Sequence, residues 1–350
     1  MVSRHRQEHT ERSRHRRYLV LTLLVLLLAG GWIGLWYYAA GHGEAAVEGW
    51  RAREAKAGRD YVCGKQTVGG FPFRFELVCD RAAATFRSVE PPLELKTARI
   101  LVAAQIYQPN LLIAEYTGPL TIGARGRAPQ MTLKWSLAQS SVRGTPAAPE
   151  RVSIAVEAPV LEGESPAGVM MRARRVEIHG RLAEGSVASR PAIEIALRAE
   201  QLSVPAAGPL AVVPIAADIS GTLRGLRDYS PKSWSARFRE MQANGGRIEI
   251  TRARLEQGQT LALGSGTLSI NANGRLDGQI NMAVAGVEGF INALGAATQQ
   301  RTGLGFTLGL GLLGGNAQVE GRRAIALPLR IGDGTVYFGP LKVGEIPPLF

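Results

Sequence analysis

The chain has few of the side chains on which catalysis and metal binding depend. It holds two cysteines and five histidines in 350 residues, and four of the histidines lie before residue 43. The fifth, His179, alternates with apolar neighbours on an expected strand, which indicates a solvent-facing side chain. Because no other histidine or cysteine stands near it, the sequence offers no zinc site.

Motifs of nucleophilic and phosphate-binding sites are missing as well. There is no Gly-x-Ser-x-Gly, no phosphate-binding glycine loop and no His-Glu-x-x-His. The aspartates beyond residue 58 stand mostly beside Gly, Arg or Asn, in contexts typical of turns. We therefore expect neither an enzyme nor a cofactor.

Clustered positive charge is also lacking, although the formal net charge is +12. Beyond the first 17 residues the basic side chains are scattered singly or in pairs, with no run of five. A nucleic-acid site requires a clustered basic face, so we expect no nucleic-acid partner. Scattered charge favours solubility and weak attraction to anionic lipid headgroups.

The strongest positive signal is an apolar run near the N-terminus. Residues 19–35 carry no charge, and residues 18–38 would span about 31 Å as a helix at about 1.5 Å per residue. That length matches a bilayer core. Tyr18 at one end and Trp36, Tyr37 and Tyr38 at the other are typical of headgroup-level aromatic belts. The pattern predicts a membrane anchor over residues 18–40.

A cleaved secretory signal is the alternative interpretation of this run. Such signals have an apolar region of about 7–15 residues before a small-x-small site. The run here is longer, and its best cleavage site, Ala39 and Gly41, follows bulky aromatics, so an uncleaved anchor is favoured. The head, residues 1–17, has six arginines against two glutamates, which predicts a cytoplasmic N-terminus with the bulk of the chain exported.

The two cysteines, Cys63 and Cys79, both lie in the exported part. In an oxidising compartment they are expected to form a disulfide. A redox pair is the alternative, but the Cys-x-x-Cys spacing and a neighbouring histidine are both missing.

Beyond the anchor, the hydrophobic period changes from helical to strand-like. Residues 41–58 have helical composition and predict a juxtamembrane helix that ends at Gly58. Residues 59–350 alternate apolar and polar side chains between Gly, Pro and Asn turns. Asn273-Gly274 between two such runs predicts a hairpin. The clearest alternating runs are at 71–75, 152–156, 176–178, 193–197, 248–250, 268–272 and 276–284.

This pattern predicts a mainly β fold: an elongated, mostly antiparallel sheet with one apolar and one polar face, plus a few amphipathic helices. A sandwich and a curled sheet with an open apolar face both fit. Sub-boundaries are expected near 144–149 and 204–214, where Pro and small residues gather. Residues 286–300 predict an amphipathic helix, and the Leu-Gly alternation at 302–315 indicates a tightly packed strand or a lipid contact.

The order of the motifs resembles a known family. A basic head, an anchor, Tyr61-Val62-Cys63, the run Gly69 to Phe75 and a closing Gly332-Asp333-Gly334 resemble an uncharacterised family of Gram-negative envelope proteins, domain-of-unknown-function family 2125. The late region, including 327–331, is more loosely similar to AsmA-like proteins. The resemblance implies a bacterial inner-membrane protein with a periplasmic β domain, associated with phospholipid movement and envelope integrity.

The strand alternation, together with this resemblance, indicates candidate residues for lipid or partner binding. Arg74 would point away from the apolar strand face and is a candidate headgroup or partner contact. The candidates for core packing or for an acyl-chain groove are Phe71, Phe73, Phe75, Leu268, Ile270, Leu276, Ile280 and Met282. We expect a non-enzymatic lipid-shielding or lipid-transport factor with the bilayer, phospholipid and other envelope proteins as partners. The alternative is a structural adaptor that docks another envelope protein and holds no lipid.

Overall fold

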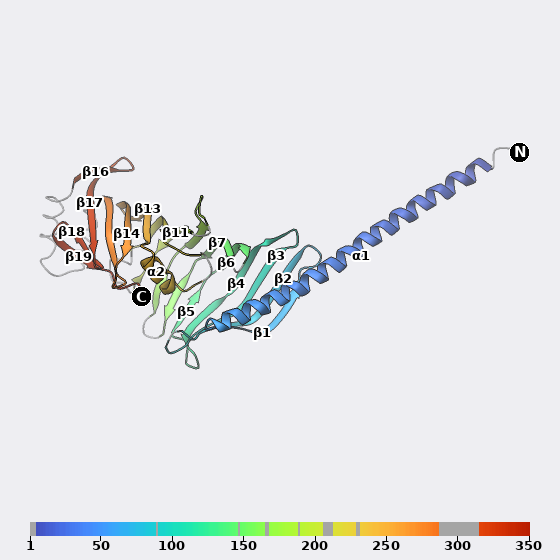
Figure 1. The fold of residues 1–350 in the computed structure, drawn as a ribbon, viewed down its shortest axis with the longest axis horizontal. Coiled ribbons are helices and arrows are strands. Elements are labelled where there is room, and N and C mark those ends of the chain that lie inside the picture. The colour runs from blue at the N-terminus through green and yellow to red at the C-terminus, as the bar shows by residue number, and fades with distance from the viewer. Residues whose placement is uncertain are drawn as a thin grey trace.

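The computed structural model describes residues 5–88, 90–145, 148–164, 168–187, 190–205, 213–228, 232–286 and 315–350. A long helix, α1 (His5–Lys56), projects from a curled β-sheet (Figure 1). The helix expected at 286–300 and the Leu-Gly segment at 302–315 lie outside the described ranges, apart from their end residues Gly286 and Gly315.

Helix α1 joins the expected anchor and the expected juxtamembrane helix into one rod. The side chains from Tyr18 to Leu28 are mostly exposed, as expected for a helix that requires an apolar surrounding. Among the described residues, one helix is long and apolar enough to cross a membrane, and this is consistent with either an anchor or a signal sequence. The helix ends at Lys56, and Gly58 follows with a φ of +79°, the left-handed conformation that favours glycine after a helix.

Nineteen strands are found in the described residues, and they form one sheet. The strands of the first half are β1 (Arg59–Gly69), β2 (Arg74–Phe86), β3 (Leu93–Gln105), β4 (Gln108–Ala124), β5 (Met131–Lys134), β6 (Leu137–Thr145), β7 (Ala148–Glu157), β8 (Val160–Gly163), β9 (Val169–Arg172) and β10 (Arg175–Leu182). The second half contains β11 (Ile193–Leu202), β12 (Ile215–Arg224), β13 (Arg247–Gln257), β14 (Thr260–Ile270), β15 (Leu276–Ala285), β16 (Gly315–Val319), β17 (Arg322–Gly332), β18 (Thr335–Phe338) and β19 (Leu341–Glu345). The second helix, α2 (Trp234–Ala243), lies between β12 and β13.

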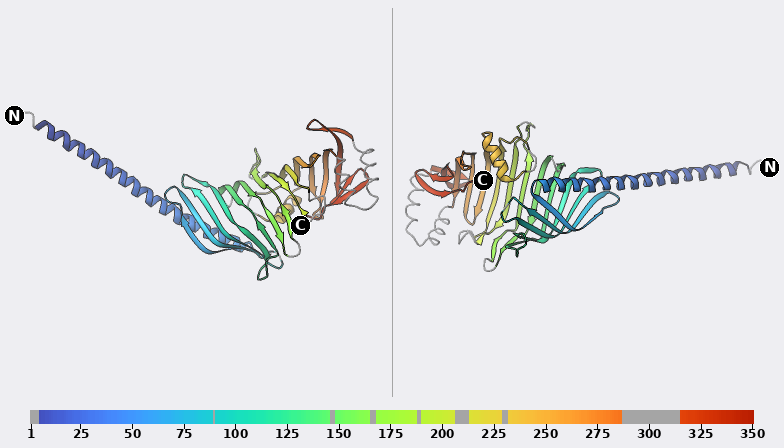
Figure 2. Two further views of the ribbon diagram at one scale, coloured as in Figure 1. Left: turned by 180° about the vertical axis from the view of Figure 1, so that it is seen from behind. Right: turned by 60° about the horizontal axis from the view of Figure 1, so that its bottom comes forward.

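The strands pair antiparallel, almost always with their neighbours in the chain. The main ladder runs β1-β2-β3-β4-β6-β7-β10-β11-β12-β13-β14-β15-β17-β18-β19. Strands β5, β8 and β9 form a short branch beside β4, and β16 pairs with β17. The sheet curls along the molecule without closing (Figure 2). The mainly antiparallel prediction is confirmed, with one curled sheet instead of two packed sheets.

The register of the ladder separates an apolar face from a polar one. Opposite residues of antiparallel strands point to the same side, so a row of partners reports the composition of one face. We call the face that carries α1 and α2 the inner face (Figures 1 and 2). One inner row, from β1 to β17, is Val68, Leu77, Val102, Ala114, Ser140, Ile154, Ile178, Leu197, Ile219, Ala253, Gly264, Met282 and Leu327.

A second inner row contains no polar side chain. It lies two residues from the first row, or three on β13, where the pairing shifts at a bulge. From β2 to β18 it is Phe75, Ala104, Leu112, Val142, Val152, Gly180, Ile195, Gly221, Ile250, Gly266, Ile280, Leu329 and Phe338. An outer-face row lies one residue beyond the second inner row. From β10 to β18 it is Arg181, Glu194, Thr222, Glu249, Thr267, Gln279, Arg330 and Tyr337. The inner face is therefore apolar across almost the whole sheet.

Two local predictions need correction. Phe71 and Phe73 lie in the turn before β2, which begins at Arg74, so the strand expected over 71–75 was wrong there. Gly70, with a φ of +97°, and Pro72, which has no N–H, favour a turn at this point. The second correction concerns Ala272: it lies in the 271–275 loop of the confirmed β14–β15 hairpin, where Gly274 has a φ of +73°.

The other alternating runs coincide with strands β7, β10, β11, β13, β14 and β15. The proposed sub-boundaries do not interrupt the sheet, because β6 pairs with β7 and β11 pairs with β12 across them. The main core lies where α2 packs on the inner face, with Met241 at its centre and Leu223, Leu226, Leu268 and Leu276 around it.

Truncation at the centre of this core tests how α2 is held. Met241 is fully buried, so Met241→Ala removes packed atoms and leaves a cavity, and we expect a loss of about 2–5 kcal/mol in the free energy of unfolding. Trp234→Ala on the same helix is the control, because that side chain is exposed. Denaturant unfolding of the full chain in detergent measures both. Equal effects of the two substitutions would contradict the packing described.

Candidate functional site

The inner face is the candidate functional site, and its two ends are covered by different elements. At the first end α1 lies on β1 and β2. The Trp50 ring packs on Tyr61 with centroids 4.6 Å apart, and a side chain at Gly43 would meet the Phe75 ring at 2.9 Å. At the second end α2 buries Leu268 and Leu276.

Between these ends the apolar surface is open to the surroundings. Ile154 on β7 and Ile178 on β10 lie opposite each other in the first inner row. Their exposed fractions are 39% and 42%, against 5% for Leu268 under α2. Neither described helix packs on these central strands. The sheet thus exposes a band of apolar side chains at its centre.

The disulfide lies beneath α1 at the first end. Cys63 and Cys79 are bonded, as the sequence predicted. Arg51 of α1 reaches over them, with Nη2 3.1 Å from Cys63 Sγ and 2.6 Å from the Gln66 Oε1. The disulfide joins β1 to β2, so the strands that receive the helix are cross-linked.

The predicted groove residues divide between these regions. Leu268, Ile270 and Leu276 are buried in the core under α2, and Ile280 packs against that core. Phe75 lies under α1, whereas Met282 belongs to the first inner row, the row of Ile154 and Ile178. Ile154 and Ile178 themselves were not among the candidates, although their strands were predicted, because alternation alone does not show which strands a helix covers.

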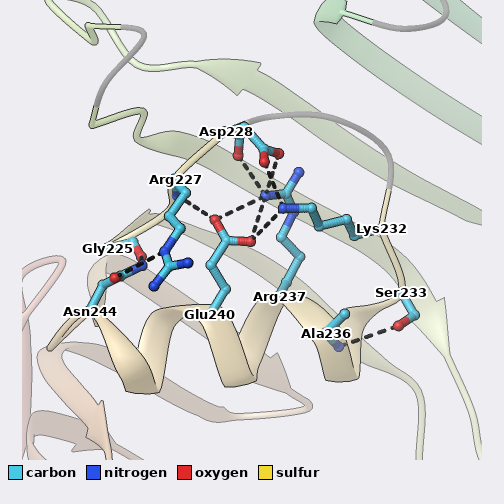
Figure 3. A network of polar contacts seen from close by, with 9 residues as sticks. All are labelled: Gly225, Arg227, Asp228, Lys232, Ser233, Ala236, Arg237, Glu240 and Asn244. Atoms are coloured by element: carbon cyan, nitrogen blue, oxygen red, sulfur yellow. Dashed lines mark hydrogen bonds and ion pairs between the residues drawn. The ribbon is translucent and has the colours of Figure 1, made fainter.

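A polar network fastens α2 to the preceding loop (Figure 3). Lys232 Nζ lies 2.7 Å from Asp228 Oδ2 and 2.9 Å from Glu240 Oε2, and Arg237 Nη1 lies 3.2 Å from the same Glu240 oxygen. The Arg237 and Glu240 side chains are almost fully buried. Ser233 caps the helix by accepting from the backbone N–H of Ala236.

This network shifts the ionisation of Glu240. Burial raises the pKa of the carboxyl, but the hydrogen bond from the Arg227 backbone N–H, the Lys232 ammonium and the Arg237 guanidinium outweigh it and hold the pKa below its ordinary value. The charged form of Glu240 therefore stabilises the folded state.

The predicted anchor residues lie at both ends of the apolar run. Tyr18, Tyr37 and Tyr38 are exposed, as a headgroup-level position requires. Trp36 is only 7% exposed, because its Nε1 donates to the Arg74 carbonyl at 3.0 Å and its ring meets Phe71 edge-on at 5.6 Å. The Arg74 guanidinium is exposed and pairs with Glu76 at 2.7 Å.

The described residues offer little for chemistry on the sheet. They contain no group of three His, Cys, Asp or Glu side chains that is placed to hold a metal ion. His179 lies on the outer face, in register with Ser153 and 3.7 Å from Glu177. These contacts describe a polar surface position.

The structure is that of a β-rich protein. It joins an apolar N-terminal helix to an open antiparallel sheet whose continuous apolar face is only partly covered. The chain belongs to the family described as an uncharacterised protein conserved in bacteria, DUF2125, whose model matches residues 36–347. No curated protein matches the chain. These comparisons do not show the likeness to AsmA-like proteins, which stays a prediction.

The lowered pKa of Glu240 gives a pH-dependent prediction. Because the folded-state pKa is below the unfolded one, the stabilisation is fully present above about pH 4.3, the ordinary Glu value, and is lost as the pH falls through the lower folded pKa. Glu240→Gln is expected to cost about 2 kcal/mol at neutral pH and little at about pH 3.

Denaturant unfolding of the full chain at both pH values measures this difference. Glu249→Gln is the control, because its partner Arg224 is exposed and such pairs contribute little. A Glu240→Gln effect that is the same at both pH values would rule out the charged carboxylate as the stabilising form.

Proposed function

We propose that this protein is a membrane-anchored, non-enzymatic factor that shields phospholipid acyl chains on the inner face of its sheet, on the periplasmic side of a bacterial inner membrane. The observation that carries the proposal is the pair of apolar rows that cross the sheet, with Ile154 and Ile178 left exposed at their centre. A soluble domain that served only as a scaffold would bury such rows against a second layer.

The energetics of burial support an apolar occupant. Removing apolar surface from water is favourable by about 25 cal/mol per Å², or about 0.8 kcal/mol per CH2 group. The strands β4, β6, β7 and β10 lie between the parts of the sheet that α1 and the α2 core cover, and they span about 14 Å at about 4.8 Å per strand. One leaflet of a bilayer core is about 15 Å thick, so an acyl chain fits this distance.

The outer face supports the same orientation of the sheet. It carries cross-strand ion pairs such as Arg181 with Glu194 at 2.6 Å and Arg224 with Glu249 at 2.8 Å. Charged pairs of this kind prefer water. Water on one face and acyl chains on the other satisfy both faces of a single sheet.

The contacts of α1 favour an uncleaved anchor. Trp32 Nε1 donates to the Pro72 carbonyl at 2.9 Å, and Trp36 makes the corresponding bond to Arg74. Cleavage near Ala39 would remove both bonds from the fold. The excess of arginine in residues 1–17 favours a cytoplasmic N-terminus.

Site-specific photocrosslinking tests the shielding proposal in the full chain. A photoreactive phenylalanine analogue is placed at Ile178, on the inner face, or at the neighbouring His179, on the outer face, in bacteria whose phospholipids carry a radioactive phosphate. We expect phospholipid crosslinks at position 178 that are at least about tenfold stronger than at 179, because consecutive strand residues face opposite sides.

The two positions share a strand and differ only in face, so expression and membrane insertion are matched. Equal labelling, or no lipid at either position, would refute acyl-chain shielding. Protein crosslinks at 178 without lipid would replace it with the adaptor function.

A further inference from the structure

The turn between β1 and β2 carries an unusual concentration of exposed aromatic side chains. Phe71 and Phe73 are 51% and 62% exposed, and Tyr107 in the β3–β4 turn is 71% exposed. The two turns are joined, because the backbone N–H of Ile106 donates to the Phe73 carbonyl at 3.1 Å. We call Phe71, Pro72, Phe73 and Tyr107 the aromatic tip.

The aromatic tip packs against the apolar part of α1 and not against the polar part that follows it. The Phe71 ring lies 5.6 Å from the Trp36 ring, and the Phe73 ring lies 6.2 Å from the Trp32 ring. At about 1.5 Å per residue, Trp36 is about 3 Å and Trp32 about 9 Å from Tyr38 toward the middle of the run. A bilayer whose surface lies at Tyr38 therefore contains Phe73.

Four backbone carbonyls of this turn have hydrogen-bond partners, which favours an apolar surrounding. An unpaired carbonyl or N–H inside a bilayer costs several kcal/mol, so irregular backbone is tolerated there only when its polar groups find partners. The carbonyl of Pro72 accepts from Trp32, that of Arg74 from Trp36, and that of Phe73 from Ile106. The Gly70 carbonyl accepts from the Arg74 N–H, and Pro72 has no N–H to satisfy.

The distribution of charge around the aromatic tip is compatible with its lying inside a bilayer. The described tip contains no ionisable carboxylate or ammonium, and the first charged side chain after it is Arg74. Its guanidinium is exposed and paired with Glu76, the next residue but one along β2. Arginine at the edge of an apolar insertion favours anionic headgroups.

We propose that the aromatic tip is inserted in the leaflet on the side of the sheet, with Phe71 and Phe73 among acyl chains and Tyr107 near the headgroups. The insertion places the first end of the inner face at the bilayer surface. The proposal rests on the anchoring part of the proposed function and is independent of whether the inner face binds lipid.

Spin-label accessibility of the full chain in vesicles of phosphatidylethanolamine and phosphatidylglycerol tests the insertion. Phe73→Cys and, separately, Tyr107→Cys receive a nitroxide while Cys63 and Cys79 stay oxidised. We expect both labels to favour collision with oxygen, which concentrates in the acyl region, at least about threefold more than a label at Ala128→Cys. Residue 128 lies in the exposed turn beyond the other end of the 17-residue strand β4.

A label at Leu24→Cys lies inside the apolar run, six residues from Tyr18, and distinguishes failure of the insertion from failure of the anchor. If position 24 is in acyl chains while 73 and 107 are as accessible to an aqueous nickel chelate as 128, anchoring stands and the insertion is refuted. If position 24 is also accessible to the chelate, both the anchor and the insertion are refuted. In the described part of the chain no aromatic ring of α1 packs on Tyr107. A label at Tyr107 therefore reports insertion without disturbing the contact between Phe73 and Trp32.

Discussion

A single sheet with one apolar face cannot leave that face in water, and this constraint governs the rest of the structure. Sandwiches satisfy it with a second sheet, and α/β folds satisfy it with rows of helices. Here α1 covers β1 and β2, and α2 covers Leu268 and the strands around it through its own Met241. The central band with Ile154 and Ile178 is left exposed. The proposed acyl occupant completes the layer that the described elements leave open.

The same constraint gives α1 two surroundings along one continuous helix. Its apolar first part is exposed in the structure and, as proposed, lies in lipid, whereas its second part packs on the sheet through Trp50 and Gly43. The change of surroundings falls near Trp32 and Trp36, where the indole N–H groups bond the β1–β2 turn. These contacts fix the sheet relative to the apolar part of α1, so that the proposed anchor would hold the sheet at a defined height above the bilayer.

Much of this arrangement follows from sequence patterns, because the strongest signals are local. The uncharged run of α1, the alternation of strands such as β7 and β15 and the cysteine pair each predicted what the structure contains. The turn at Phe71 and Phe73 was misread because apolar alternation continues through it, although Gly70 and Pro72 carried the opposite signal.

The remaining features depend on contacts between distant residues. Helix α2 is only ten residues long, and its stability comes from Met241 in the core and from the Lys232–Glu240 network. The i, i+3 spacing of Phe238 and Met241 was a weak sequence signal for this helix. The continuous inner rows require the register of every strand pair, and a slip of one residue exchanges the faces. Alternation in a single sequence predicts that faces exist but not how they align.

Native mass spectrometry of the full chain, released from detergent, tests acyl-chain binding on the inner face by counting bound phospholipid. We expect a defined phospholipid ratio that is retained in Ser153→Asp, on the outer face, and lost in Ile154→Asp, one residue away on the inner face. A folded chain that carries no phospholipid, or that keeps the same ratio in both variants, would contradict it.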